Sequence, residues 1–174
     1  MSNLIIYYSR NGENYVNGKI RRLVKGNSEI CAELILRHFG GELFKIEPVS
    51  DYPADYKECT EAAKEELNAG ARPELKRYLE DISSYENVII CGPNWWGTFP
   101  CPVFTQLEKL DWSGKTVLVV MTHEGSGLGR SLEDIKSVCK GAKTVEGFAV
   151  KGSDAAASEW PMRAWAAPYL TKEQ

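Results

Sequence analysis

The sequence predicts an α/β protein, a three-layer α/β/α sandwich built on a five-stranded parallel sheet. Short apolar runs alternate with segments of helical periodicity along the chain, and this alternation is typical of a parallel sheet with helices on both faces. The unusual loops all follow the same ends of the predicted strands. Right-handed crossovers favour the strand order 2-1-3-4-5, which places a ligand crevice at the carboxyl ends of strands 1 and 3.

The strands are predicted from short runs that end at glycine, proline or polar residues. Thr116–Met121 (TVLVVM) is rich in β-branched residues and fits a strand that is buried on both faces. Glu42–Glu47 (ELFKIE) alternates between polar and apolar residues, as a strand with one exposed face does. The predicted strands cover residues 4–8, 42–47, 88–91, 116–121 and 147–150.

The helices are predicted from apolar spacing and from signals at their ends. After the first strand, Ile30 and Leu34 fall at helical spacing, and Gly40-Gly41 ends this helix. Asn27 or Ser28 can cap its start. The other predicted helices cover residues 54–69, 73–79 and 102–107, a segment with Leu132, Ile135 and Val138, and a final segment that follows Ser153 and Asp154 and includes Pro161.

Length and composition predict one domain over residues 1–174. The net charge of −3 argues against a nucleic-acid-binding protein, whose surface would be strongly basic. No apolar run approaches the roughly 20 residues of a membrane span, so we expect no membrane partner. The start of the chain lacks the features of a signal peptide, and we expect a cytoplasmic protein.

The five cysteines are odd in number and form no CxxC pair. They fit neither a disulfide framework nor a zinc site. We therefore expect buried free thiols and no metal site.

The loop between the first strand and the first helix, residues 9–28, is unusually long. It begins with Ser9-Arg10 and ends with Lys25-Gly26-Asn27-Ser28. A glycine lets backbone N–H groups turn toward an anion, short polar side chains add neutral donors, and the helix N-terminus adds a favourable dipole. These residues predict either a phosphate site or simple capping of the helix.

The loop after the third strand, Gly92–Pro100 (GPNWWGTFP), contains two adjacent tryptophans between two prolines. In a strand, Trp95 and Trp96 would point to opposite faces, whereas a loop can present a flat aromatic surface at the crevice. Each ring can bury on the order of 200 Å². The alternative is that one or both rings fill gaps between helices.

The loop after the fourth strand, Thr122–Gly129 (THEGSGLG), has three glycines within five residues. Such a loop either brings backbone close to a flat or anionic group or is only a flexible connection. It is not a dinucleotide-binding fingerprint, because that motif follows the first strand.

Together, the three loops predict an anion pocket beside an aromatic slot, which fits a ligand with a phosphate tail and a planar heterocycle. Two other classes are excluded. A phosphorylated receiver domain needs an aspartate at the end of the third strand, where this chain has Gly92-Pro93. A low-molecular-weight phosphatase needs a cysteine in the first loop, and none precedes Cys31.

The sequence resembles the flavodoxin family, in particular its short-chain bacterial flavodoxin-like proteins that bind flavin mononucleotide (FMN). The resemblance lies in the motifs YYSR (7–10), GNSE (26–29), YPADY (52–56), ARPEL (71–75), GPNWWGTFPCPV (92–103) and THEGSGLG (122–129). It implies a flavodoxin-like fold and an FMN cofactor. The implied cofactor-binding residues are Ser9, Arg10, Lys25, Gly26, Asn27, Ser28, Pro93, Asn94, Trp95, Trp96, Gly97, Thr122, His123, Glu124 and Gly125.

The phosphate loop departs from the family pattern Ser-x-Thr-Gly-Asn-Thr. Ser9-Arg10 match its start and Gly26-Asn27-Ser28 match its end, but an insertion of residues 11–24 separates the two parts. The family threonine that precedes the glycine is either replaced by Lys25 or displaced by the insertion.

The insertion is basic, with Lys19, Arg21 and Arg22 against the single acid Glu13. One hypothesis is that it adds positive charge over the FMN phosphate or receives an acidic partner or a second nucleotide. The alternative is a solvated basic surface loop.

The resemblance implies electron transfer between redox partner proteins as the function. An FMN-dependent NAD(P)H or quinone oxidoreductase is the alternative, because His123 can protonate a reduced quinone. A third hypothesis is a flavodoxin-like scaffold without a cofactor, against which the tryptophan loop argues. We expect a monomer or a weak homodimer.

Overall fold

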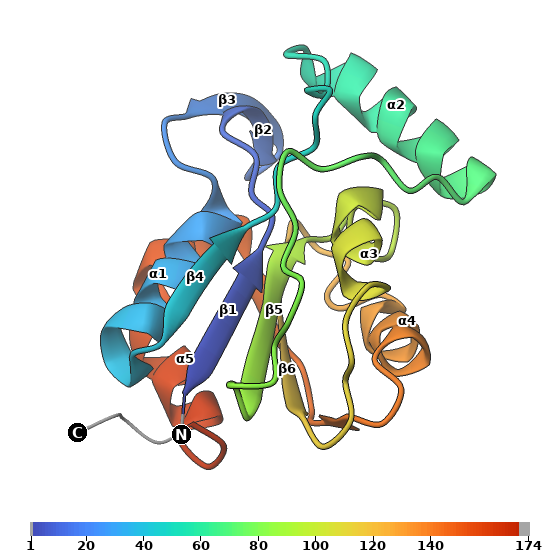
Figure 1. Cartoon of the computed structure of the whole chain (residues 1–174). Coiled ribbons are helices and arrows are strands. Elements are labelled where there is room, and N and C mark those ends of the chain that lie inside the picture. Colours follow the sequence, from blue (N-terminus) through green and yellow to red (C-terminus); the bar gives the residue numbers. More distant parts are fainter. Residues whose placement is uncertain (1, 171–174) are drawn as a thin grey trace.

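A computed structural model describes residues 2–170 of the chain. Its main sheet has the order β4-β1-β5-β6-β7, and β8 also pairs with β6 (Figure 1). Every pairing in this sheet is parallel. The strands are β1 (Asn3–Tyr7), β4 (Glu42–Lys45), β5 (Asn87–Pro93), β6 (Thr116–His123), β7 (Lys143–Thr144) and β8 (Phe148–Lys151). The predicted order 2-1-3-4-5 is confirmed, with the fifth strand divided into β7 and β8.

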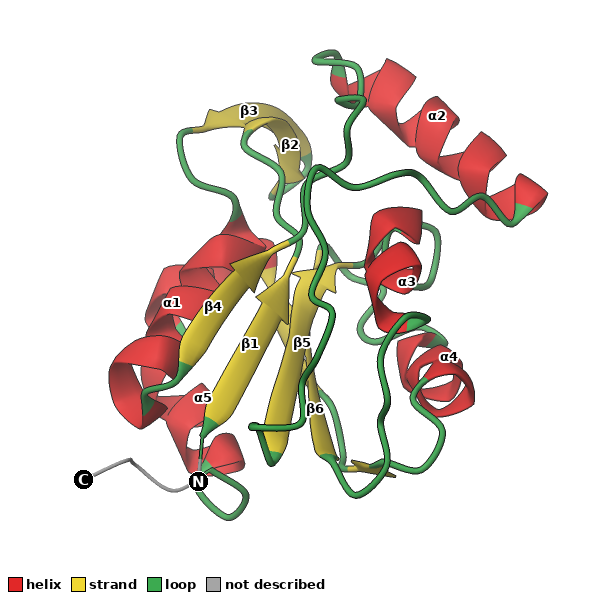
Figure 2. Cartoon of the chain, viewed as in Figure 1, coloured by secondary structure: helices red, strands yellow, loops and turns green. Residues whose placement is uncertain are grey.

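Helices cover both faces of the sheet (Figure 2). α1 and α5 pack on one face, and α3 and α4 pack on the other. The helices are α1 (Asn27–Phe39), α2 (Tyr56–Ala69), α3 (Cys101–Leu107), α4 (Ser131–Val138) and α5 (Glu159–Ala166), with a 3₁₀ helix over Gly152–Ala157. α2 lies beyond the carboxyl edge of the sheet, and Asp55 caps it by accepting a hydrogen bond from the Glu58 amide.

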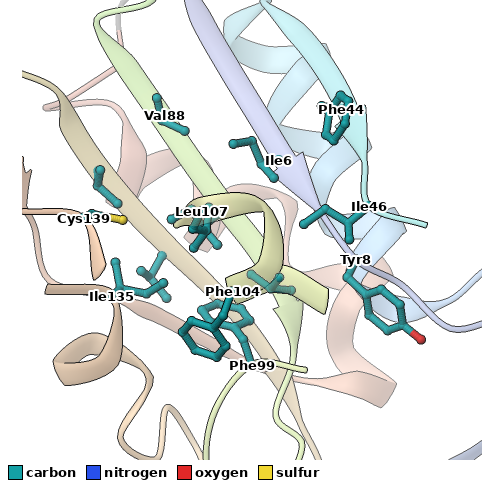
Figure 3. Packing of buried hydrophobic residues seen from close by; sticks show 14 of the residues in the cluster. Ile6, Tyr8, Phe44, Ile46, Val88, Phe99, Phe104, Leu107, Ile135 and Cys139 are labelled. Carbon is teal, nitrogen blue, oxygen red and sulfur yellow. The ribbon is translucent and has the colours of Figure 1, made fainter. Parts of the chain in front are cut away.

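Alternation along the strands divides the core into two layers. In β1, Leu4 and Ile6 face α3 and α4, whereas Ile5 and Tyr7 face α1 and α5. All four side chains are buried, because successive residues of a strand point to opposite faces and both faces are covered. Figure 3 shows the first layer, where Ile6 and Val88 of the sheet lie near Leu107 of α3.

The predicted helix over residues 73–79 is wrong. This segment contains no helix and pairs instead with the chain after β4. The Val49 amide donates to the Glu74 carbonyl, and the Lys76 amide donates to the Glu47 carbonyl, both at 2.8 Å. These bonds use backbone groups that a helix would need internally, and they place Leu75 in the core, where it is 3% exposed.

The insertion is an ordered β-hairpin of β2 (Gly12–Val16) and β3 (Lys19–Leu23). Asn17 and Gly18 form its turn, with φ values of 51° and 78°. Two consecutive positive φ angles fit a two-residue primed turn, which Asn-Gly strongly favours. The hairpin stands above the carboxyl ends of the main-sheet strands (Figure 1).

The remaining structural expectations concern cysteines, metals and the membrane. The five cysteines are buried free thiols, as predicted. Within residues 2–170, no group of acidic, histidine or cysteine side chains is arranged to hold a metal ion. None of the described helices has the length and apolar character needed to cross a bilayer.

We predict that Ile89→Ala lowers the free energy of unfolding of the apoprotein by about 2–5 kcal/mol, because the truncation opens a cavity in the central strand β5. Ile89 is 0% exposed. The matched control is Ile20→Ala on the hairpin, where the side chain is 54% exposed and we expect a change within about 0.5 kcal/mol. Urea unfolding followed by circular dichroism measures both variants, and equal losses would contradict the assignment of the core.

Candidate functional site

A cavity of about 340 Å³ opens at the carboxyl ends of β1, β5 and β6. The three predicted loops meet there, because parallel strands place their carboxyl ends on one edge of the sheet. The predicted residues that line it are Ser9, Arg10, Asn27, Ser28, Pro93, Asn94, Trp95, Thr122, His123 and Glu124. Ten of the fifteen predicted residues therefore lie around one cavity.

The start of α1 forms one end of the cavity, and the expectation that Asn27 or Ser28 caps this helix is wrong. Gly26 occupies the cap position, and neither side chain makes a capping bond. Ser9, from the preceding loop, instead accepts a hydrogen bond from the Glu29 amide at 3.1 Å. The Ser28 hydroxyl pairs with the Thr122 hydroxyl at 2.7 Å.

This arrangement leaves two backbone amides at the start of α1 without a recorded partner among residues 2–170. The structure records no hydrogen bond from the Asn27 and Ser28 amides to any residue in the range 2–170. Free amides in the first turn of a helix carry a partial positive charge and bind phosphate readily. The start of α1 therefore has the character of a neutral phosphate cradle.

Two glycines allow the close packing around this cradle. A Cβ atom at Gly26 would lie 2.1 Å from the Ser9 Oγ and 2.5 Å from the Arg10 carbonyl oxygen. A Cβ atom at Gly152 would lie 2.6 Å from the Asn27 Nδ2 and 2.7 Å from the Glu124 Oε1. Gly26 requires glycine because a side chain would collide with the backbone of Arg10, whereas a side chain at position 152 would shift the ends of Asn27 and Glu124.

The two tryptophans have different environments. Trp95 lines the cavity and packs edge-on against Tyr8 and Tyr52, with ring centroids 5.3 and 4.9 Å away. Trp96 is 48% exposed and leans on α2, where its Nε1 donates to the Thr60 carbonyl at 2.9 Å. The alternative of gap filling thus applies in part to Trp95, while Trp96 is half-exposed, with the Lys64 ammonium over its ring at 5.0 Å.

The loop after β6 supplies one ring and one carboxylate. The Nδ1 of His123 accepts a hydrogen bond from the Gly125 amide at 2.9 Å, which leaves Nε2 as the nitrogen available to a ligand. The Oε2 of Glu124 accepts from the Asn17 amide at the hairpin turn at 3.1 Å. Its Oε1 is buried and has no hydrogen-bond partner within residues 2–170.

Arg10 has a structural role that its place in the phosphate motif did not indicate. Its guanidinium donates three hydrogen bonds of 2.9 Å, to the carbonyls of Glu13, Pro53 and Ala54. It thereby joins the first loop to the hairpin and to the segment before α2, while its charge remains in the cavity wall.

Five predicted residues do not line this cavity: Lys25, Gly26, Trp96, Gly97 and Gly125. Lys25 points away and forms an ion pair with Glu33 at 2.6 Å. Trp96 and Gly97 line a second cavity of about 310 Å³, beside the first. The two cavities share Arg10, Asn14, Tyr56, Asn94, Trp95 and Ser126, so they are two lobes of one site.

Sequence reasoning missed Asn14, Tyr15, Tyr56, Ser126 and Gly152, which also line the first lobe. The rings of Tyr15 and Tyr56 stack at 6.0 Å with an interplanar angle of 24°. Burial raises the pKa of Tyr56, so its hydroxyl remains protonated at neutral pH. The Asn17-Gly18 turn signal could have predicted the hairpin from the sequence. The contact between the hairpin and α2, through Tyr15 and Tyr56, is visible only in the tertiary structure.

A family model described as flavodoxin matches residues 23–166. The chain belongs to the flavodoxin family. No curated protein matches it, whereas several solved structures share its fold. A protein of Bacteroides uniformis ATCC 8492 is 22% identical with a TM-score of 0.74, and the match covers 95% of this chain and 97% of that one.

Two further structures extend this comparison. A protein of Bacteroides eggerthii DSM 20697 is 25% identical with a TM-score of 0.73, and the match covers 96% of each chain. A flavoprotein of Lactobacillus acidophilus NCFM, solved in complex with FMN, is 19% identical with a TM-score of 0.63 and coverage of 92% of this chain and 98% of that one. Membership of the flavodoxin family supports FMN as the cofactor of this chain.

We predict that the thiols of this flavodoxin react negligibly with Ellman's reagent at pH 8 in the native state. Burial raises the pKa of Cys31 and of Cys139 to about 12, so the reactive thiolate is scarce at this pH. In denaturant, where burial is lost, all five cysteines should react. Rapid labelling of the native protein, read from absorbance at about 412 nm, would contradict the packing described for these side chains.

Proposed function

We propose that this flavodoxin binds FMN in the two-lobed site and transfers electrons between redox partner proteins. The observation that carries the proposal is that neutral phosphate donors and large aromatic side chains border the same cavity. FMN carries a dianionic phosphate and a planar ring system, and each half matches one part of this lining. When bound, FMN supplies the redox chemistry, and the protein supplies binding, orientation and electrostatics.

Ser9, Asn27 and Ser28 would hold the phosphate. Their donors are uncharged. Of the two neighbouring cations, Lys25 is engaged with Glu33, and Arg10 donates to three backbone carbonyls. Binding would then depend on the α1 dipole and on amides held in place before the ligand arrives, which lowers the entropic cost of binding.

Trp95 and Tyr56 would flank the flavin ring. Trp95 is held edge-on by Tyr8 and Tyr52, and Tyr56 is held by its stack on Tyr15. Aromatic walls favour a neutral ring over a charged one and exclude water from it. The half-exposed Trp96 beside them would keep one edge of the ring close to the surface, where an electron can leave or enter.

An FMN-dependent NAD(P)H or quinone oxidoreductase is the second candidate. The second lobe, of about 310 Å³, offers space for a planar substrate next to the shared residues, and the Nε2 of His123 is available for proton transfer. An NADH:FMN oxidoreductase shares this fold, with 13% identity and a TM-score of 0.53 over 99% of this chain and 92% of that one. This likeness supports only the compatibility of the fold with such an activity.

We predict that Asn27→Asp weakens FMN binding by about tenfold or more, which corresponds to about 1.4 kcal/mol. The change places a carboxylate at the phosphate cradle, while an acid in the first turn of α1 is favourable for the helix itself. Flavin fluorescence measures the affinity. Riboflavin, which lacks the phosphate, is the control ligand, and the substitution should change its affinity for the protein little. An equal loss for both ligands would contradict the placement of the phosphate.

We predict that the purified protein reconstituted with FMN is yellow and is not bleached by NADH or NADPH under anaerobic conditions. A carrier receives its electrons from a protein partner and has no need of a nicotinamide site. A loss of absorbance at about 450 nm reports reduction of the flavin. Bleaching within seconds would favour the oxidoreductase, and a protein that stays colourless with excess FMN would contradict both functions.

A further inference from the structure

The outer strand of the hairpin, β3, carries an isolated group of positive charges. Lys19, Arg21 and Arg22 are all exposed in a chain whose net charge is −3. None of the three forms an ion pair within residues 2–170, whereas Lys25 just beyond them pairs with Glu33. Three cations on five residues, with the single acid Glu13 across the hairpin from Arg22, create a local positive potential that attracts an acidic surface.

The position of the hairpin joins this strand to the candidate site. The inner strand β2 contributes Asn14 and Tyr15 to the cavity wall. The Glu13 carboxylate accepts from the Tyr56 amide at 2.7 Å, and the Asn17 amide donates to Glu124. These contacts hold β2 against the site and leave β3 on the outside, without a partner strand on its other edge among residues 2–170.

Exposed apolar side chains accompany the charges. Ile20 is 54% exposed and Val24 is 97% exposed, and Tyr15, paired with Ile20 across the hairpin, is 43% exposed. Three of the six large apolar side chains that are exposed among residues 2–170 thus lie on this hairpin, and protein interfaces combine apolar contacts with arginine in this way. We name Lys19–Leu23 and Val24 together the β3 surface.

Two simpler roles for the charges fit less well. Charge over the FMN phosphate is disfavoured, because none of the three cations lines the first lobe. Protection of a free strand edge against aggregation is a common role for lysine, but acidic residues would serve it equally. Edge protection also does not explain why Ile20 and Val24 are exposed beside the cations.

We propose that the β3 surface is the docking site for an acidic electron-transfer protein. The inference rests on the proposed electron-transfer function and adds the charge of the partner and the place where it binds. In the complex, one electron leaves the reduced centre of the partner and enters oxidised FMN, a proton from water balances the charge, and no bond forms between the proteins. Tyr15, which pairs with Ile20 of this surface and lines the cavity, brings the partner next to the site.

The test uses the FMN-loaded protein and a reduced acidic [2Fe–2S] ferredoxin as the probe. Stopped-flow absorbance gives the bimolecular rate of flavin reduction across a range of ionic strength. The variant K19E/R21E/R22E reverses the β3 charges, and it retains protection of the strand edge. The control K136E/K140E/K143E makes the same change in net charge at exposed positions on α4, after it and on β7, at the opposite end of the sheet.

At low salt, we expect the β3 variant to react about 10-fold or more slowly than the wild type, and the control to stay within about 3-fold, because steering depends on local charge. At about 0.5 M salt the rates should converge, because screening removes the steering. FMN affinity and the circular dichroism spectrum of the β3 variant should match those of the wild type.

Several results would overturn the proposal. One is an equal rate for the β3 variant and the wild type at low salt, and another is an equal loss in the control. A dimer that the β3 substitutions dissociate, seen by analytical ultracentrifugation, would assign the surface to a second copy of the chain. A higher KM for NADPH in the β3 variant would assign it to a nucleotide. A protein that does not bind FMN fails the proposed function instead, so the two failures are distinguishable.

Discussion

The site depends on the parallel pairing of β1, β5 and β6. In this register Tyr7 lies beside Cys91, and Cys91 lies beside Val120, so the three strands end within three residues of one another and their loops emerge at one edge. Apolar side chains on both faces hold the strands in this register, because a slip of one residue would exchange the two core layers. The chemistry of the loops thus depends on a core that contains none of the candidate ligand-binding side chains.

A second set of contacts gives the open edge of the sheet its walls. Arg10 joins the first loop to the hairpin and to the chain before α2, and Glu13 and Glu124 each accept a bond from a backbone amide of another segment. In each of these bonds one partner is a backbone group. The bonds therefore fix the positions of the segments without requiring a particular side chain on the second segment. Three segments far apart in the sequence are held as one wall through these bonds.

The fold and most of the cavity lining could be predicted from the sequence, because both depend on local signals. Apolar runs identified the strands, and strand order placed Ser9, Trp95 and Thr122 together. The helix over 73–79 was wrong because pairing with residues 47–49 outweighed a proline start signal. The roles of Arg10 and Tyr56 depend on contacts between distant segments, which no local pattern reports.

The hairpin leaves and rejoins the chain at a single place, since Gly12 pairs with Leu23 at its base. Such an insertion can lengthen, shorten or change its outer residues without disturbing the strand before it or the helix after it. Substitutions on the outer strand β3 can therefore change the surface that the hairpin presents, while Asn14 and Tyr15 of the inner strand β2 keep their places in the cavity wall. In this architecture, the outer surface and the cavity wall are separable features carried by adjacent pieces of one loop.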